Sequence, residues 1–460
     1  MGIAVVLARC LGPEKFGALV FLQWLSDMTY LLFSGGLAGV ATRFFPQSIH
    51  PNNGNTSVFG NWFIRSAGVV VLISFVFAGV ATLLFGGQNR PFEIVAVAFL
   101  GGASACYALA TARSQGLFQY RKIAYASTVF IAVTFFGLIF ASIRTSVPLT
   151  IILLACANCA GSLCLLLDLR KTPESLFAPL SRDLSKHIGQ YAKNSWVTSV
   201  ISSLLWSRGE LPLVRKNLGE ASVGYYSIAL TISGIVNQAL SLLIGALWPQ
   251  IALNWDRGAA EKLDEFCNTL TNLLILLAGL SIGLIVCLSS HIIGLLFGTK
   301  YLPSTDIVSI LALGTLGLTS GCANLVVQAK TDGKFARNIS VLGSGLLFGL
   351  AIILIPLFGV QGAAVTRVTT QIAIAVATLV WMRKMSSLPA DRHNNLLIFF
   401  LVLVLSILLS TVKSLMPGLA VWGDLSLLAV YTFAVVFACT NGLRINIFNE
   451  VKSLSRLGHG

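Results

Sequence analysis

The chain has 460 residues, of which 56% are hydrophobic and only 10% are charged. Soluble domains carry roughly 25% charged residues, so this composition excludes a soluble globular protein and predicts a polytopic membrane protein. The formal net charge of +14 does not indicate nucleic-acid binding, because the basic residues lie at the ends of apolar runs and form no patch interleaved with aromatic residues.

Apolar runs of the length that a spanning helix needs, about 20 residues, recur along the whole chain. The first run, residues 2–8, is too short to cross a bilayer, so we expect that the chain starts inside a first span or lacks that span. The later spans are expected at residues 16–44, 59–86, 92–113, 122–143, 148–169, 194–216, 222–253, 266–298, 303–329, 336–357, 360–382, 396–416 and 420–441. The expected fold class is therefore all-α, with thirteen or fourteen spans and a truncated first one.

Two glycines in a turn repeat at a constant distance along the chain. Gly12 and Gly17 recur 207 residues later as Gly219 and Gly224, and the turn at 115–121 has a counterpart at 328–334. Such repeats are common in transporters and predict two six-helix lobes in parallel orientation. The expected parts are an N-terminal lobe at 1–170, a cytoplasmic linker at 171–193, a C-terminal lobe at 194–386, a helix pair at 387–443 and a cytoplasmic tail at 444–460.

Glycines spaced four residues apart predict close helix contacts. Three such motifs occur, Gly35-x-x-x-Gly39, Gly279-x-x-x-Gly283 and Gly345-x-x-x-Gly349. They indicate a packed helical bundle and say nothing about function.

The basic residues predict the orientation of the chain in the membrane. If the linker lies in the cytoplasm, roughly two thirds of the 31 Lys and Arg residues fall at cytoplasmic ends of spans. This bias places the C-terminus in the cytoplasm.

The sequence offers no pattern typical of an enzyme, a metal site or a cofactor site. Cys156 and Cys159 form a C-x-x-C pair inside an apolar run, where small packing residues are the better interpretation. A membrane glycosyltransferase or polymerase would need a large outer loop with carboxylates, and the longest polar interruption is instead the linker. We therefore expect neither an enzyme nor a bound metal or cofactor.

Ionisable residues inside spans are costly and usually face a cavity or a partner. Six stand out, namely Asp27, Arg43, Arg65, Arg113, Glu210 and Arg367. The plainer interpretation of Arg43, Arg65 and Arg113 is that their long side chains reach the cytoplasmic interface. For Glu210 it is an outer salt bridge with Arg208 or Arg215, and for Asp27 and Arg367 an interhelical ion pair.

Several segments resemble a known family. They are LARCLGPEKFGALVF, GGLAGVATRFFP, LGEASVGYYSIAL with the following LWPQIA, and LIPLFGVQGAAVTR. They are similar to the polysaccharide-transporter, or Wzx-type flippase, branch of the multidrug/oligosaccharidyl-lipid/polysaccharide exporter superfamily, and the resemblance runs along nearly the whole chain. The chain departs from the family at its start, where most of the first helix is absent.

The resemblance implies two six-span lobes with a C-terminal helix pair in the bacterial inner membrane. It also implies export of an undecaprenyl-diphosphate-linked oligosaccharide for O-antigen (lipopolysaccharide), capsule or exopolysaccharide, by alternating access, alongside a polysaccharide polymerase and assembly proteins.

A sugar diphosphate is polar and anionic, so a cationic cavity would shelter it in the membrane. Arg43, Arg65, Arg113 and Arg367 are the expected cations, and Asp27 and Glu210 are the expected sites for coupling to a proton or sodium ion. A cation-coupled multidrug exporter is the first alternative, although it would favour an acidic cavity. A flippase for a peptidoglycan lipid precursor also remains open.

Overall fold

The computed structural model describes residues 2–34, 36–48, 56–85, 91–141, 146–167, 182–206, 208–256, 260–330, 334–386, 394–416 and 421–441. Every regular element within these residues is helical, which confirms the all-α fold class. The chain forms two compact units, Met1–Leu211 and Pro212–Gly460, which are described separately below. The expected tail at 444–460 and the first part of the expected linker lie outside the described residues.

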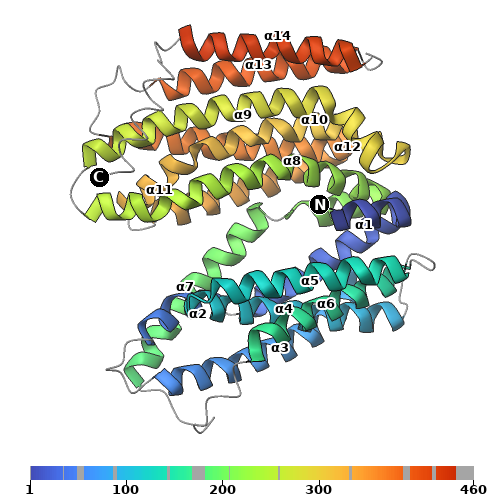
Figure 1. Ribbon diagram of the computed structural model, residues 1–460, viewed down its shortest axis with the longest axis vertical. Helices are drawn as coiled ribbons and strands as arrows, with labels where there is room; N and C mark the ends of the chain where they lie inside the picture. Colours follow the sequence, from blue (N-terminus) through green and yellow to red (C-terminus); the bar gives the residue numbers. More distant parts are fainter. Residues whose placement is uncertain are drawn as a thin grey trace. The chain divides into compact units, whose positions relative to one another are not determined.

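The first unit contains seven of the described helices (Figure 1). They are α1 (Gly2–Phe33), α2 (Leu37–Ser48), α3 (Thr56–Phe85), α4 (Pro91–Gly116), α5 (Tyr120–Ala141), α6 (Val147–Leu166) and α7 (Arg182–Trp206). Helix α4 packs against α1, α2, α3, α5 and α6, so it forms the centre of this unit.

Glycines allow α4 to approach its neighbours closely. A Cβ atom built on Gly101 would lie 2.5 Å from Ala78 Cβ of α3, and one built on Gly116 would lie 2.5 Å from the carbonyl oxygen of Ala41 in α2. Both spacings are too short for a real Cβ, so these contacts require glycine in α4.

The second unit contains the remaining elements. They are α8 (Leu211–Asp256), α9 (Ala260–Leu296), η3 (Thr299–Tyr301), α10 (Ser304–Leu313), η4 (Gly314–Ser320), α11 (Gly321–Lys330), α12 (Lys334–Met385), α13 (Asn395–Leu415) and α14 (Val421–Asn441). Helix α9 is central here and contacts α10, α11, α13 and α14.

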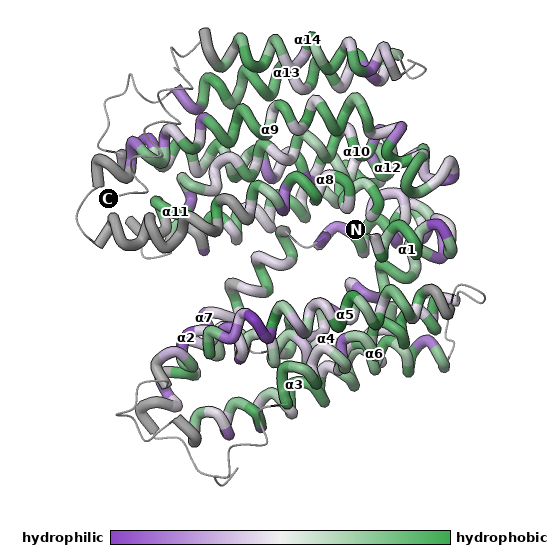
Figure 2. The backbone as a smooth tube through the Cα atoms, viewed as in Figure 1, coloured by the Kyte–Doolittle hydropathy of each residue, from purple (hydrophilic) through white to green (hydrophobic). Residues whose placement is uncertain are grey.

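Eight helical stretches in the described part of the chain are long and apolar enough to cross a membrane. They are Phe59–Phe85, Pro91–Gly116, Tyr120–Leu138, Val147–Leu166, Asp264–Leu296, Ser304–Val327, Arg337–Met385 and Asn395–Leu415. The stretch Arg337–Met385 has 49 residues and contains a kink at Gly359, so it holds both spans expected at 336–357 and 360–382. Hydrophobic residues predominate along the helices of both units (Figure 2).

The two repeated glycines adopt nearly the same backbone conformation. Gly12 interrupts α1 with φ 73° and ψ 172°, and Gly219 interrupts α8 with φ 81° and ψ 179°. Only glycine adopts these angles readily, because a Cβ atom would collide with the neighbouring backbone. The equal conformations explain why both turns carry glycine at the same place in the repeat.

Three expected spans are interrupted in the structure. The span expected at 16–44 is divided between α1 and α2, and the span expected at 194–216 is divided between α7 and α8 by a turn at Arg208. The span expected at 303–329 has the 3₁₀ segment η4 in its middle. Hydropathy averaged over a whole span does not reveal such breaks, because a few polar or glycine residues, such as 34–36 and 207–210, are outweighed by the apolar residues on both sides.

The break between α1 and α2 is stabilised by specific contacts. The Ser34 N–H and hydroxyl donate to the carbonyls of Tyr30 and Leu31, at 2.8 and 3.0 Å. Trp196 Nε1 of α7 donates to the Leu32 carbonyl at 2.8 Å. These donors satisfy carbonyls that a helix end leaves without an intrahelical partner. Specific hydrogen bonds therefore stabilise the break, and α7 supplies one of them through Trp196.

Glycines also decide how α7 packs on this break. A Cβ on Gly36 would collide with the carbonyl oxygen of Ala192, and one on Gly39 with the hydroxyl of Ser195. The predicted close contact of the Gly39 motif is therefore confirmed for Gly39 itself, whereas Gly35 lies outside the described residues. By these contacts, α7 associates with the first unit.

The Gly279 motif brings α9 against the C-terminal helix pair. A Cβ on Gly279 would lie 2.8 Å from Val402 of α13, and one on Gly283 would collide with the ring of Tyr431 in α14. The Tyr431 hydroxyl donates to the Gly279 carbonyl at 3.1 Å. Close packing is confirmed here. At Gly345 and Gly349 the prediction is wrong, because a Cβ on either would meet nothing within 4 Å.

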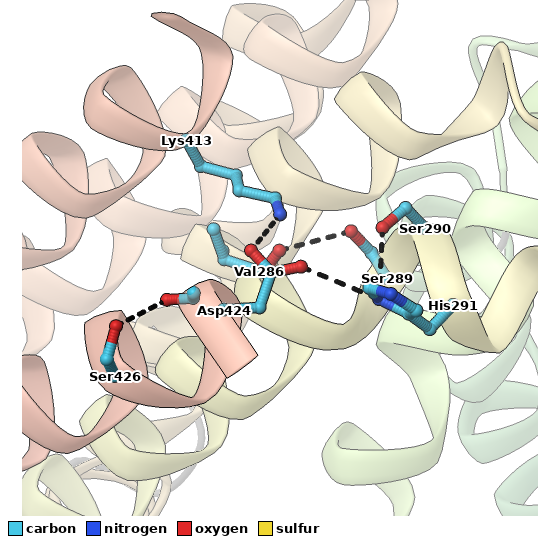
Figure 3. A network of polar contacts seen from close by, with 8 residues as sticks. Val286, Ser289, Ser290, His291, Lys413, Asp424 and Ser426 are labelled. Atoms are coloured by element: carbon cyan, nitrogen blue, oxygen red, sulfur yellow. Dashed lines mark hydrogen bonds and ion pairs between the residues drawn. The ribbon is translucent and has the colours of Figure 1, made fainter. Parts of the chain in front are cut away.

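A charge network joins the same three helices within the second unit (Figure 3). Lys413 of α13 pairs with the carboxylate of Asp424 in α14, and His291 Nδ1 of α9 lies 3.5 Å from Asp424 Oδ2. Asp424 is fully buried. The network fixes the C-terminal helix pair to α9 through charge as well as apolar packing.

Candidate functional site

Two of the cations predicted in the first unit, Arg43 and Arg113, lie at one buried aromatic cluster. The cluster joins α2, α3, α4 and α7, and its buried members include Phe44, Phe45, Phe59 and Phe63. Phe45 packs edge-on to Phe59 and Phe63, with ring centroids 4.9 and 5.2 Å apart. A rigid aromatic cluster of this kind holds the neighbouring backbone, and hence the side chains beside it, in fixed positions.

Arg43 directly precedes Phe44 and Phe45 in α2. Its side chain is exposed, and its guanidinium carbon lies 4.5 Å from the centre of the Tyr191 ring of α7. Tyr191 also packs edge-on to Phe44, with centroids 5.7 Å apart. A cation over an aromatic face is attracted by the ring quadrupole and keeps its hydrogen-bond donors available.

Arg113 approaches the cluster from the last turn of α4. Its guanidinium carbon lies 5.9 Å from the Phe45 ring, and its Nε is buried with no hydrogen-bond partner among the described atoms. A cation is favoured at this place because the helix dipole is negative at its C-terminal end.

Arg65 lies on α3 two residues after Phe63, a member of the same cluster, and its side chain is exposed. The structure therefore brings Arg43 and Arg113 to one aromatic cluster from two different helices, whereas Arg65 lies on another face of α3 from Phe63. A pair of cations of this kind is suited to an anionic group, because both can share its charge.

Arg367, the fourth predicted cation, belongs to the second unit. It lies in α12 after the Gly359 kink and is only 8% exposed. One turn later, the Gln371 side chain packs where Gly314 and Gly317 of η4 leave room, and a Cβ on Gly317 would lie 2.8 Å from Gln371 Cβ. Arg367 is thus held on a helix that fits tightly against the 3₁₀ segment.

Asp27, the deepest predicted acid, lies on an exposed polar stripe of α1. Gln23 and Asp27 are both exposed and stand one helical turn apart, and Tyr30 continues the same face. Arg208, which attracts the Asp27 carboxylate electrostatically, lies outside α1.

The turn between α7 and α8 places Arg208. Arg208 has a positive φ of 64°, and a Cβ on the next residue, Gly209, would collide with the Leu204 carbonyl. Glu210 follows and is fully buried. Both predicted coupling acids are thus associated with one turn, since Arg208 attracts the Asp27 carboxylate electrostatically and Glu210 lies two residues beyond Arg208. Arg215, an alternative partner for Glu210, forms an ion pair with Glu220 at 2.7 Å.

Sequence reasoning missed the role of four residues. Arg208 was expected only as a partner of Glu210, because its separation from Asp27 along the chain gives no signal. Tyr191 lies in the polar linker region, where an aromatic residue is usually interpreted as an anchor at the membrane interface. Lys413 and Asp424 flank the short connection between two spans, and opposite charges at that spacing are a signal that could have found the pair.

Residues 6–306 of the chain match the family described as polysaccharide biosynthesis protein. A stretch of 231 residues is 24% identical to the probable low-salt glycan biosynthesis flippase Agl15 of Haloferax volcanii. This match covers 49% of the chain and 47% of that protein, so the chain spans about half the length of the curated relative it matches.

Two solved structures have similar folds at 14% sequence identity. One is the Lipid II flippase MurJ in an inward closed conformation, with a TM-score of 0.71 over 96% of this chain and 97% of that one. The other is an inward-facing multidrug resistance MATE family transporter of the MOP superfamily, with a TM-score of 0.61 over 83% of this chain and 93% of that one.

These relatives are named as flippases and transporters, in agreement with the expectation that the chain is not an enzyme. The chain belongs to the polysaccharide biosynthesis protein family and has the multi-pass fold seen in transporters of the MOP superfamily.

Proposed function

We propose that the chain is a flippase that moves an undecaprenyl-diphosphate-linked oligosaccharide across the bacterial cytoplasmic membrane by alternating access. The observation that carries the proposal is the convergence of Arg43 and Arg113 on one aromatic cluster of the first unit. A diphosphate needs several cations in a membrane, and these two come from separate helices on a rigid support. The family and the glycan flippase among the relatives support the same substrate class.

Arg367 is proposed as the cation of the second lobe, and Asp27 and Glu210 as the sites of coupling to a proton or sodium gradient. The turn at Arg208 supports the role proposed for the two acids. Glu210 follows this turn and is buried, and Arg208 attracts the Asp27 carboxylate electrostatically. The two lobes, 1–170 and 194–386, are proposed to be parallel repeats, supported by the matching conformations of Gly12 and Gly219.

A transport assay tests the proposal. The full chain is reconstituted into vesicles that contain an undecaprenyl-diphosphate oligosaccharide, and exposure of the sugar on the opposite leaflet is measured with a membrane-impermeant lectin or glycosidase. We expect faster exposure than in empty vesicles and further acceleration by an ion gradient. Equal exposure with and without protein would overturn the proposal.

Two alternatives are decided by the choice of substrate in the same vesicles. Lipid II, suggested by the fold of MurJ, tests a peptidoglycan-precursor flippase. An organic cation tests a multidrug exporter, suggested by the MATE fold. The cluster of arginines disfavours a cationic drug, because like charges repel in a low-dielectric site.

A further inference from the structure

A cavity of about 310 Å³ lies within the first unit beside the aromatic cluster, since Leu37, Val70 and Ile188 belong to both. It is open on one side and is lined by the α1–α2 break, by α3 and by α7. This volume corresponds to about ten water molecules and lies at the lower end of small-molecule sites. It is far too small for an oligosaccharide, but it admits a short segment of a single chain.

Helix α7 lines the cavity with one of its faces. On α7, Ser185, Ile188, Gly189 and Ala192 line the cavity, and their spacing places them on one helical face. Those residues belong to the polar half of α7. The same face of α7 also packs on the α1–α2 break and on the aromatic cluster through Ile188 and Ala192, so the cavity lies next to a well-packed contact.

The opposite walls combine apolar groups with hydroxyls. Ser66 and Val70 line the cavity from α3, one turn apart, and Phe33 and Ser34 line it at the α1–α2 break. Hydroxyls from three elements, Ser34, Ser66 and Ser185, are thus present in one small space. An amphiphile matches this mixture, because its chain contacts the apolar groups while its polar end accepts hydrogen bonds.

The cavity lies near one end of a membrane span. The span Phe59–Phe85 begins three residues before Trp62, which also lines the cavity, and tryptophan favours the interface between water and hydrocarbon. Two cations flank the lining serines, since Arg65 precedes Ser66 and Lys186 follows Ser185. Both side chains are exposed. Neither cation lines the cavity itself, but both lie on the helices that do, so they are available for an anionic end at the interface while an apolar chain lies inside.

We propose that this cavity binds the phosphate-proximal segment of a polyisoprenyl phosphate, with the phosphate near Arg65 and Lys186. The choice of lipid rests on the proposed function. It also follows from size, because a polyisoprenyl phosphate has one chain attached directly to phosphate, whereas a phospholipid brings a glycerol and two chains. The site would hold the lipid part of the substrate against α7 and the α1–α2 break.

Glycine substitutions give a sharp test. A Cβ on Gly189 meets nothing within 4 Å, so Gly189→Leu fills the cavity without displacing other atoms close by. Gly68 of α3 is exposed, also has nothing within 4 Å, and does not line the cavity, so Gly68→Leu is the matched control. Binding of undecaprenyl phosphate to the purified full chain is measured by titration in nanodiscs.

We expect Gly189→Leu to weaken binding about tenfold, because excluding even two chain carbons has an effect of this size. Gly68→Leu should bind like the unmodified protein. Ser66→Leu fills the cavity from α3 and gives a second variant if Gly189→Leu is poorly folded. Unchanged binding in a folded Gly189→Leu or Ser66→Leu protein would overturn the proposal.

The charge component is tested with Arg65→Gln and Lys186→Gln, with Lys216→Gln as a control for an exposed lysine elsewhere. We expect weaker binding and a smaller salt dependence for the first two only. Phosphatidylglycerol and inorganic pyrophosphate are the competing probes. Equal affinity for phosphatidylglycerol, or retention of pyrophosphate alone, would overturn the assignment to a polyisoprenyl lipid.

The binding result is independent of the transport assay. If undecaprenyl phosphate binds and Gly189→Leu abolishes binding, the cavity assignment stands even when no sugar is moved, and the proposed function alone fails. If sugar is moved equally by the unmodified protein and Gly189→Leu with equal binding, the function stands and the cavity assignment fails.

Discussion

Lys413 and Asp424 form a buried ion pair between α13 and α14 (Figure 3). Asp424 is fully buried and also faces His291 of α9, so three helices meet at one carboxylate. Each of these buried charges is stabilised by the other. Either one alone would be an uncompensated charge in a medium of low dielectric constant, which is strongly unfavourable.

We therefore predict that Lys413→Met or Asp424→Leu alone destabilises the C-terminal helix pair by about 3–5 kcal/mol. The double variant Lys413→Met/Asp424→Leu should recover most of this loss, because no lone charge remains. Unfolding of the full chain in detergent measures the free energies, and Lys300→Met is the control for an exposed lysine. Additive losses in the double variant would contradict the prediction.

The glycines of α9 and α12 provide a matched comparison. Gly283→Ala places a methyl group in collision with the Tyr431 ring, so we expect a destabilisation of about 1–3 kcal/mol. Gly345→Ala meets nothing within 4 Å and should be neutral or stabilising by about 0.5–1 kcal/mol, because alanine favours the helix. Thermal unfolding of both variants in the same detergent distinguishes them. A neutral Gly283→Ala would show that α9 and α14 do not depend on this close approach.

The arginines around the aromatic cluster give a prediction about transport. Arg43→Gln and Arg113→Gln should each reduce sugar exposure about tenfold or more, because each removes a charge from a shared anion site. Arg121→Gln is the control, since Arg121 lies over the Tyr125 ring at 5.7 Å but outside the cluster. Abundance of each variant in the membrane is measured in parallel. If transport falls only in proportion to the amount of protein in the membrane, these arginines stabilise the fold and do not bind the substrate.

Lysine variants separate charge from geometry at the same positions. If charge alone is needed, Arg113→Lys should recover much of the activity that Arg113→Gln loses. If a planar, bidentate contact to the diphosphate is needed, lysine should recover little.

Asp27 and Arg208 should act as one unit in ion coupling. We predict that Asp27→Asn abolishes acceleration by an ion gradient while substrate binding stays within about twofold, because the cation that attracts this carboxylate electrostatically is Arg208 of the α7–α8 turn. Arg208→Gln should give the same defect, and the double variant should be no worse than either single one. Gln23→Leu, on the same exposed stripe of α1, is the control. Additive effects of the two substitutions would show that Asp27 and Arg208 act independently, which would contradict the prediction.

Sequence alone determined the class of molecule. Low charge and recurrent apolar runs require a lipid environment, since water would not tolerate so much exposed apolar surface. The repeated glycines identified the two equivalent kinks, because only glycine adopts the backbone angles found there. The Gly279 motif similarly predicted a close contact that side chains larger than hydrogen would prevent.

The tertiary structure decided which residues meet. The α1–α2 break depends on Trp196, which is 164 residues away from its acceptor Leu32, and no local pattern announces such a hydrogen bond. The gathering of Arg43 and Arg113 at one aromatic cluster, and the electrostatic attraction of Arg208 for Asp27, also depend on how separate helices pack. Hydropathy records how readily each segment leaves water, which is a local property. Partners are selected by steric fit and by charge pairing between distant segments, and these become defined only when the chain is folded.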